Sequence, residues 1–303
     1  MIFKGKFKII ENRITACDYE FVLKKIEEAV KNKKSLLISP IASHTLVRAK
    51  YNKNLKKILD GFEYLVPDSQ WVRWSLDWLY GVKLPNRVYG PELMLRICDL
   101  SEKESYKIFL YGTTFKTLSL LEINLKKKFP KLKITGLEPS KFRELTKREW
   151  QELVDKIIKS KADIIFVGLG SPLQEIFSYK LNNLLKRRKV FKVIIPVGAA
   201  FDFISVTKKQ APKWIGDWGF EWLFRLINEP ILYKRYFING GVFAILTLIK
   251  FFSSVIKKHS RFKDFILIFI LNFFFILPQY FHYSSLLDVL ETFFLSYKPI
   301  NFF

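Results

Sequence analysis

Apolar and polar positions along this chain fall into two alternating kinds of block. Short apolar runs rich in Ile, Val, Leu and Phe occupy residues 35–39, 62–66, 106–111, 132–136, 163–167 and 192–197, and residues 1–10 form a further short candidate strand. Between these runs, apolar residues recur every three or four positions, which is helical spacing. The alternation predicts an α/β fold with a mostly parallel, Rossmann-like sheet and helices on both of its faces.

The helical segments carry residues that commonly begin helices. Asp18 can cap a first helix, and Pro91 can take the first position of another that runs to Leu100. Thr146 and Glu149 have the spacing of a capping box ahead of a helix over residues 147–160. Further helices are expected over residues 43–60, 115–129 and 172–188, and residues 198–203 are expected to form an exit loop.

The stretch ADIIFVGLGSPLQEIF, residues 162–177, joins a strand to a helix. Gly170 interrupts the apolar run, Pro172 can open the helix, and Gln174 and Glu175 stand in its first turn. In an open parallel sheet, ligands bind outside the carboxyl ends of the strands, where glycine lets backbone amides approach a phosphate. The turn is therefore a candidate phosphate site. The alternative is a plain turn in which Gln174 and Glu175 only cap the helix.

Charge narrows the class of partner. The chain of 303 residues has 51 Lys and Arg against 28 Asp and Glu, a formal charge of +23. This predicts an anionic partner: nucleic acid, an anionic membrane face or a phosphorylated substrate. Cys17 and Cys98 are the two cysteines, which excludes a disulfide scaffold and indicates a reducing, cytosolic location. The amino-terminal residues lack the apolar core of a signal peptide.

Polar residues follow several of the expected strands, at residues 39–43, 68–70, 112–114, 170–175 and 198–202. A parallel sheet would bring these loops to one rim. No GxSxG, GxGxxG, GxxxxGK[ST] or DxD pattern occurs, so a serine hydrolase, a dinucleotide enzyme, a P-loop enzyme and a metal-clamped transferase lose their usual signals. Asp68, at a strand end, is the best candidate general base, and its alternative role is a turn or helix cap.

Six segments in order resemble one known family. They are PDSQWVRW (67–74), RVYGPELM (87–94), VGLGSPLQE (167–175), VGAAFDF (197–203), APKW (211–214) and EWLFRLINEPILYKRY (221–236). Together they look like the WecG/TagA/CpsF family of bacterial glycosyltransferases. The resemblance covers residues 12–236, most of the chain.

The resemblance implies an inverting, metal-independent glycosyltransferase. Such an enzyme moves a sugar, of the N-acetylmannosamine type or a related hexose, from a UDP-sugar to a sugar carried on a polyprenyl diphosphate. The expected setting is polysaccharide or teichoic acid synthesis at the cytoplasmic side of the bacterial cell membrane. No cofactor and no nucleic acid partner are expected, and relatives indicate self-association.

The resemblance also assigns roles to residues of the matching motifs. Asp68 becomes the base that deprotonates the acceptor hydroxyl. Donor contacts are expected from Arg87, Gly90, Gly170, Pro172, Gln174, Glu175 and Asp202. Acceptor or diphosphate contacts are expected from Arg225, Arg235, Ser43 and His44. For Arg225 and Arg235, the alternative is a pair of solvated basic residues on an amphipathic helix.

The chain departs from the family pattern at three places. Where family members commonly carry Thr-x-Asn after the early strand, this chain reads SPIASH over residues 39–44. Ser43 or His44 can do that work, or Ser43 is a cap and His44 a half-buried residue. Val206 stands where Gly is frequent, and Gln210 replaces an Arg. Both changes lie near the expected rim.

Composition predicts three parts: an α/β core (1–205), a basic, Trp-rich appendage that completes the active site (206–240) and a hydrophobic, membrane-associated helical tail (241–303). Within the tail, residues 265–281 are apolar nearly throughout, but Asn272 and Pro278 interrupt them. A single span with a cytosolic amino-terminal side, a re-entrant or interfacial segment, and a buried helix all remain open.

Two other functions compete with the transferase. The charge of +23 alone is compatible with a basic protein that binds nucleic acid or anionic membrane without turnover, although no nucleic-acid module is recognisable. The missing Thr-x-Asn is compatible with a catalytically degenerate family member that acts as an assembly partner for other enzymes. The ordered motifs favour the transferase.

Overall fold

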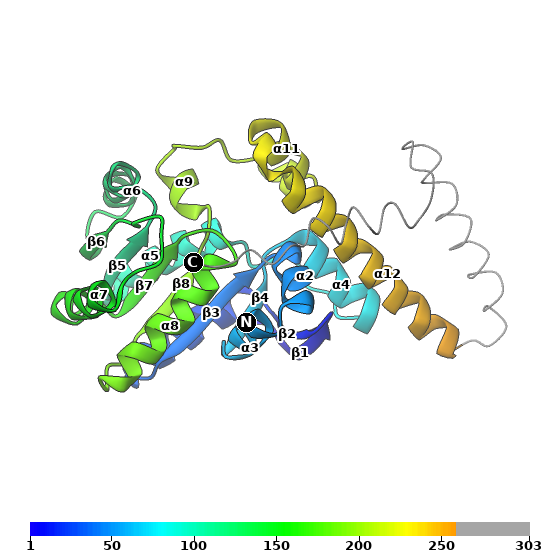
Figure 1. The fold of residues 1–303 in the computed structure, drawn as a ribbon, viewed down its shortest axis with the longest axis horizontal. Coiled ribbons are helices and arrows are strands. Elements are labelled where there is room, and N and C mark those ends of the chain that lie inside the picture. Colours follow the sequence, from blue (N-terminus) through cyan, green and yellow to red (C-terminus); the bar gives the residue numbers. More distant parts are fainter. Residues whose placement is uncertain (259–303) are drawn as a thin grey trace. The chain divides into compact units, whose positions relative to one another are not determined.

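The computed structural model describes residues 1–258 (Figure 1). Its contacts group Met1–Phe243 into one compact unit, and a second unit begins at Ala244. The first unit holds both sheets and the helices around them. The predicted division of the chain at residues 205 and 240 stays a prediction.

The larger sheet has six strands in the order β4-β3-β8-β7-β5-β6. They are β4 (Tyr64–Pro67), β3 (Leu36–Ile41), β8 (Val193–Pro196), β7 (Ile164–Gly168), β5 (Lys107–Gly112) and β6 (Lys133–Glu138). Every neighbouring pair runs parallel. The predicted parallel α/β sheet is therefore confirmed, with strand ends within two positions of those expected.

Helices cover both faces of this sheet, as the alternation predicts. Successive strand residues point to opposite faces, so Ile165 and Val167 join one hydrophobic core while Ile164 and Phe166 join the other. The first core takes side chains from α2 (Ser43–Tyr51), α3 (Lys53–Asp60), α4 (Gln70–Tyr80), α7 (Lys147–Ser160) and α8 (Leu173–Arg187). The second takes them from α1 (Tyr19–Lys31), α5 (Gly90–Glu104), α6 (Phe115–Lys128) and α9 (Ala200–Ile204).

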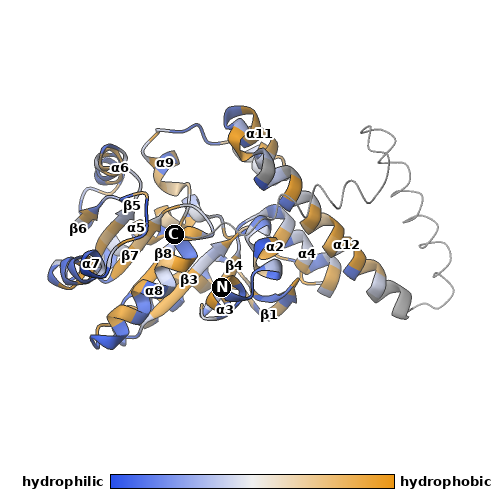
Figure 2. Cartoon of the chain, viewed as in Figure 1, coloured by the Kyte–Doolittle hydropathy of each residue, from blue (hydrophilic) through white to orange (hydrophobic). Residues whose placement is uncertain are grey.

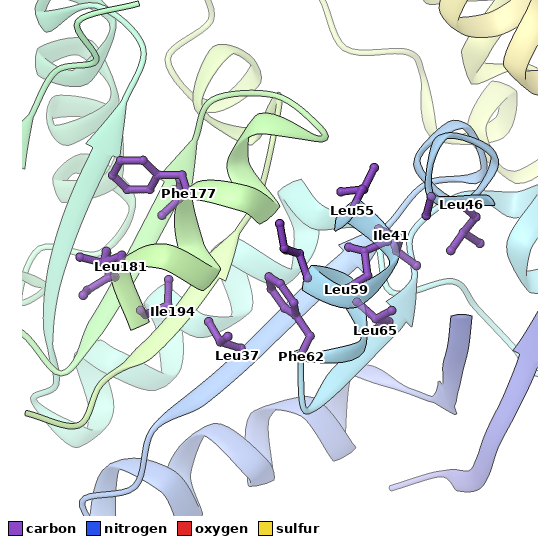
Figure 3. Packing of buried hydrophobic residues seen from close by; sticks show 14 of the residues in the cluster. Leu37, Ile41, Leu46, Leu55, Leu59, Phe62, Leu65, Phe177, Leu181 and Ile194 are labelled. Atoms are coloured by element: carbon purple, nitrogen blue, oxygen red, sulfur yellow. The ribbon is translucent and has the colours of Figure 1, made fainter. Parts of the chain in front are cut away.

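The first core shows how the two kinds of pattern combine. Phe177 and Leu181 of α8 lie beside Ile194 of β8, and Leu59 of α3 lies beside Ile41 of β3 (Figure 3). Helix α8 carries both hydrophobic and hydrophilic residues, whereas β7 is hydrophobic from Ile164 to Val167 (Figure 2). Burial of such side chains, at roughly 1.5–3 kcal/mol each, supplies most of the driving force for this layered arrangement.

The helix expected over residues 43–60 is wrong as a single element. It divides at Asn52, whose side chain accepts a hydrogen bond of 2.9 Å from the Leu55 N–H and so caps α3. Asparagine is a strong helix N-cap, and its extended backbone breaks the preceding helix. The loop expected over residues 198–203 likewise contains the short helix α9.

Two elements, β2 and α4, were not anticipated. The amino-terminal strand β1 (Phe3–Ile9), which lies within the expected strand over residues 1–10, pairs antiparallel with β2 (Asn12–Cys17) in a separate two-stranded sheet. Helix α4 follows Ser69, whose hydroxyl accepts from the Val72 N–H. Its partly exposed Trp71, Trp74 and Trp78 obscured the short buried stripe. By contrast, both hydrogen bonds of the predicted capping box at Thr146 and Glu149 are present.

After the last strand and α9, the chain continues through a series of helical elements. These are α10 (Lys213–Asp217), α11 (Glu221–Asn228), a 3₁₀ turn at Pro230–Leu232, a π-helical turn at Lys234–Ile238 and α12 (Asn239–Lys258). Within residues 1–258, no helix combines the length and hydrophobicity needed to cross a bilayer. The apolar segment 265–281 lies outside the described residues.

Candidate active site

The carboxyl ends of the parallel strands form one rim, and the predicted polar loops leave from it. Asp68 follows β4, Ser43 follows β3, Gly170 follows β7 and Gly198 follows β8. These four strands are neighbours in the order β4-β3-β8-β7. The sheet therefore brings to one edge the segments that the sequence singled out.

Asp68 is fixed at this rim through both its backbone and its side chain. Its backbone N–H donates to the Ile41 carbonyl at 3.2 Å, and its Oδ1 accepts from the Gly90 N–H at 2.8 Å. A Cβ on Gly90 would lie 3.2 Å from the Val197 carbonyl oxygen and 3.5 Å from Asp68 Oδ1. Glycine thus allows the backbone of Gly90 to approach the carboxylate closely.

The electrostatic surroundings of Asp68 suit a general base. Burial, the largest effect, and the charge of Glu221 raise the pKa of Asp68. Arg87, the hydrogen bond from Gly90 and Arg235 lower it. The net result is a pKa above the ordinary 3.8. Desolvation disfavours the charged carboxylate, so it binds a proton more readily. A carboxylate with this property can take a proton from a hydroxyl near neutral pH.

Arg87 links Asp68 to the appendage, the segment of residues 206–240. Its guanidinium donates to the Asp68 carbonyl at 3.3 Å and pairs with the Glu221 carboxylate at 2.5 Å. The guanidinium also lies 4.2 Å from the centroid of the Tyr89 ring. The Tyr89 hydroxyl donates to the second Glu221 oxygen at 2.9 Å. Helix α11 is therefore fastened to the loop before α5.

Gln174 and Glu175 are both buried at the start of α8. The Glu175 carboxylate accepts from Ser171 at 2.8 Å, from Gln174 Nε2 at 3.0 Å and from Ser39 at 3.3 Å. Burial raises the pKa of Glu175, and these hydrogen bonds lower it; the net direction is upward. Neither residue is the helix cap of the alternative interpretation, because Pro172 takes that position.

The bond to Glu175 also sets the orientation of the Gln174 amide. An ionised carboxylate only accepts hydrogen bonds, so it selects the amide nitrogen. Gln174 Oε1 is then a buried acceptor without a hydrogen-bond partner. It would lie 3.6 Å from a Cβ on Gly198, a position with φ of +59°. An N–H or O–H group of a ligand at this rim would satisfy it.

His44 is buried at the start of α2, where burial and three positive charges keep it neutral. Burial lowers the pKa of His44 well below 6.5, and Arg235, Arg48 and Arg225 lower it further, against a hydrogen bond with the Ser171 backbone. The Thr45 hydroxyl lies 3.3 Å from His44 Nε2 and 2.6 Å from the Ser171 hydroxyl.

The alternative roles of Ser43 as a helix cap and of His44 as a half-buried residue are both wrong. Helix α2 has Ala42 at its N-cap, so Ser43 is the first helical residue rather than the cap. His44 is 4% exposed rather than half-buried. Thr45 and Ser171 connect this helix to Glu175.

Arg225 and Arg235 are not solvated surface residues. The Arg225 side chain is 11% exposed, pairs with Glu229 at 3.1 Å and lies over the Phe203 ring. Burial lowers the pKa of Arg235, and its charge interacts with those of Asp68 and Glu175. The Nε of both arginines is buried without a hydrogen-bond partner. Guanidinium donors without a partner in the protein are groups of the kind that can bind an anion.

The remaining predicted residues have different surroundings. Asp202 lies in α9 and pairs with Lys208 at 3.4 Å, and Lys208 also pairs with Glu229 at 2.6 Å. Lys208 therefore connects Asp202 of α9 to Glu229 of the appendage. Gly170 has φ of +74° and open space around its Cβ position. Pro172 follows a cis peptide bond from Ser171.

Sequence reasoning missed several residues that complete these contacts. Glu221, Tyr89 and Ser171 lie within the segments that carried the family resemblance, whereas Thr45 follows the segment 39–44 that departs from the family pattern. Glu221 contacts Arg87 across 134 positions, so no local pattern shows the pairing. Within the described part of the chain, His, Cys, Asp and Glu residues do not gather in threes to hold a metal ion. Metal independence stays a prediction.

Comparisons with known proteins point to one family. The profile described as the glycosyl transferase WecG/TagA/CpsF family matches residues 7–256. A Bacillus spizizenii protein named N-acetylglucosaminyldiphosphoundecaprenol N-acetyl-beta-D-mannosaminyltransferase is 27% identical over 213 residues, 70% of this chain and 75% of the relative. A Bacillus subtilis protein of the same name is 26% identical over 230 residues, 76% of this chain and 82% of the relative.

Proposed function

We propose that this chain, which belongs to the WecG/TagA/CpsF family of glycosyl transferases, transfers a sugar from a UDP-sugar to a polyprenyl-diphosphate-linked acceptor, with Asp68 as the base. The family match and the names of its relatives carry the transferase activity and the class of acceptor. The raised pKa of Asp68 supports its assignment as the base, and the charge of Arg235, a proposed diphosphate contact, interacts with this carboxylate at the rim.

The proposed reaction is a single displacement. Asp68 takes the proton of an acceptor hydroxyl, and the oxygen attacks the anomeric carbon of the donor sugar. The bond from that carbon to the UDP oxygen breaks, and UDP leaves with the electron pair. Attack from the face opposite the leaving group inverts the configuration. The sugar proposed for this transfer is N-acetylmannosamine or a related hexose, in line with the names of the relatives.

Protein groups stabilise the departing diphosphate in this proposal without a metal ion. Arg235 and Arg225 offer guanidinium donors that have no partner in the protein. The turn at Gly170 and the amino-terminal end of α8 are the proposed source of further donors, because the start of a helix favours negative charge. Preorganised donors of this kind stabilise developing negative charge most strongly when water is excluded. Gln174 Oε1 is the proposed acceptor for an N–H or O–H of the donor.

The appendage is the proposed contact with the membrane that holds the lipid-linked acceptor. Trp214, Trp218 and Ile231 are 65%, 70% and 91% exposed. Aromatic and aliphatic side chains beside basic residues such as the exposed Lys209 suit the boundary between lipid headgroups and acyl chains. We place this surface on the cytoplasmic side of the bacterial cell membrane, where UDP-sugars occur.

The test is UDP release from a panel of UDP-sugars in the presence of a polyprenyl-diphosphate N-acetylglucosamine acceptor. Asp68→Asn should lower the rate by about 10²–10⁴-fold, the usual contribution of a general base. Asp99→Asn, an exposed change on α5, is the matched control and should keep the wild-type rate. Full activity of Asp68→Asn removes Asp68 from the mechanism. No turnover with any donor favours the assembly-partner function.

A further inference from the structure

Glu221, the first residue of α11, contacts the segment that holds Asp68, although the two residues are far apart in the sequence. We propose that Glu221 is a positioning residue that sets the place and the charge environment of Asp68. This proposal rests on the proposed function, in which Asp68 is the base. It makes the appendage part of the catalytic machinery through a specific residue, in addition to any role in binding the membrane or the diphosphate.

Both oxygens of Glu221 are used in contacts with the segment before α5. One pairs with Arg87 at 2.5 Å and the other accepts from the Tyr89 hydroxyl at 2.9 Å. The two charged side chains are 15% and 17% exposed, so water screens the pair weakly. A Cβ on Gly216 would lie 3.0 Å from the Arg87 guanidinium, which shows how closely α10 also approaches it.

The segment that Glu221 holds is the same segment that holds Asp68. Arg87 donates to the Asp68 carbonyl at 3.3 Å, and Gly90 donates to the Asp68 carboxylate at 2.8 Å. Tyr89, between them, is anchored from the other side, because its backbone N–H donates to the Tyr19 hydroxyl at 2.9 Å. Movement of Glu221 would therefore move Arg87 and Tyr89, and with them the two hydrogen bonds that this segment donates to Asp68.

Glu221 also balances the charges that face Asp68. These are the cations Arg87 and Arg235, the carboxylate of Glu221 and the phenols of Tyr19 and Tyr89. Burial raises the pKa of Tyr19 to about 12 and that of Tyr89 well above 10.0, so both phenols stay neutral in the working range.

Arg87 also keeps its charge, although burial lowers its pKa, because Glu221 and Asp68 raise it. Glu221 is therefore the negative charge that offsets the two guanidiniums around Asp68. Without Glu221, the two guanidiniums would keep Asp68 ionised down to a lower pH. Such a carboxylate is a weaker base, and the proton transfer slows.

The closing experiment compares pH–rate profiles of UDP release for the full-length wild type, Glu221→Gln, Glu221→Asp and Glu152→Gln. Glu221→Gln removes the charge but keeps an oxygen for Arg87 or Tyr89. We expect its plateau rate to fall about tenfold and its acidic limb to move to lower pH. Glu221→Asp keeps the charge and should retain the wild-type limb even if its rate falls. Glu152→Gln, an exposed change on α7, should match wild type.

A second measurement separates this proposal from the proposed function. The titration of the Asp68 carboxyl carbon, followed by ¹³C NMR in wild type and Glu221→Gln, reports the coupling whether or not the protein turns over a donor. A shift to lower pH in the variant supports the proposal even if no UDP-sugar is a substrate. An unchanged Asp68 titration, or a rate lowered equally at every pH with no shift of the limb, overturns it.

Discussion

The Ser39 hydroxyl donates a hydrogen bond of 3.3 Å to the Glu175 carboxylate, across 136 positions of the sequence. Both residues are fully buried, Ser39 on β3 and Glu175 on α8. Ser171 and Gln174 complete the hydrogen bonds of the carboxylate. The rim of the sheet is thus built around a buried carboxylate, and the stability of the protein depends on its protonation.

Glu175→Gln should raise the thermal stability at alkaline pH. The pKa of Glu175 in the folded protein is raised above its ordinary value of 4.5, chiefly by burial. The folded state therefore binds this proton more tightly than the unfolded state, and stability falls as pH rises through the folded pKa. The variant lacks that loss, so its melting temperature should exceed that of wild type by about 2–4 °C at pH near 8.

The difference between Glu175→Gln and wild type is expected to shrink as the pH falls through the raised pKa of Glu175, because the wild-type carboxyl then takes up its proton. Differential scanning calorimetry across this range measures it. Glu152→Gln, with an exposed side chain, controls for the general effect of removing one negative charge. A constant difference at every pH would contradict a raised Glu175 pKa.

Arg235→Gln should weaken UDP binding and shift the pH–rate profile in the direction opposite to Glu221→Gln. Loss of a charge-assisted contact typically costs about 1.5–3 kcal/mol, which is about 10- to 150-fold in affinity. Since Arg235 lowers the pKa of Asp68, its removal moves the acidic limb to higher pH.

Calorimetric titration with UDP and the rate profile test the two effects of Arg235→Gln separately. Arg96→Gln, an exposed change on α5, is the control. If Arg235→Gln binds UDP with wild-type affinity, Arg235 does not contact the diphosphate.

Gly219→Ala should loosen the appendage from α4. Gly219 has φ of +81°, and a Cβ there would lie 2.6 Å from the Trp74 ring, so both backbone and packing oppose the change. We expect a loss of about 1–3 kcal/mol in local stability and faster cleavage by trypsin after the lysines at 208 and 209.

Gly240→Ala is the matched control for Gly219→Ala. It lies in α12 with open space around its Cβ position, so alanine should favour the helix by about 0.5–1 kcal/mol. If Gly219→Ala resists trypsin as well as wild type does, the Trp74 contact does not hold the appendage.

Replacement of Trp214 and Trp218 by alanine should reduce binding to vesicles that contain anionic lipid. These side chains are 65% and 70% exposed, so their loss removes apolar area that a membrane would bury while the fold keeps its core. Co-sedimentation should fall about tenfold or more. Phe142→Ala, at 73% exposure in the α/β core, is the control. Equal binding of the double variant and the control would locate the membrane contact outside this surface.

Local patterns in the sequence were enough to predict the layers of the fold. Apolar runs and helical spacing depend on neighbours within a few residues, so they located the strands of the six-stranded sheet and most of the helices on its two faces, but not α4. Capping chemistry is equally local, and the Thr146 and Glu149 box is present as expected. The predicted helix over residues 43–60 failed because Asn52 can continue a helix or begin one, and packing decides between them.

The sequence by itself also determined which loops meet at the rim, because parallel strands all place their carboxyl ends at one edge. Only the tertiary structure decided what each side chain does there. It buried Glu175 beneath Ser39, made His44 neutral and brought Glu221 to Arg87. Burial and pairing across more than a hundred positions depend on how the whole chain packs, and no stretch of sequence contains both partners.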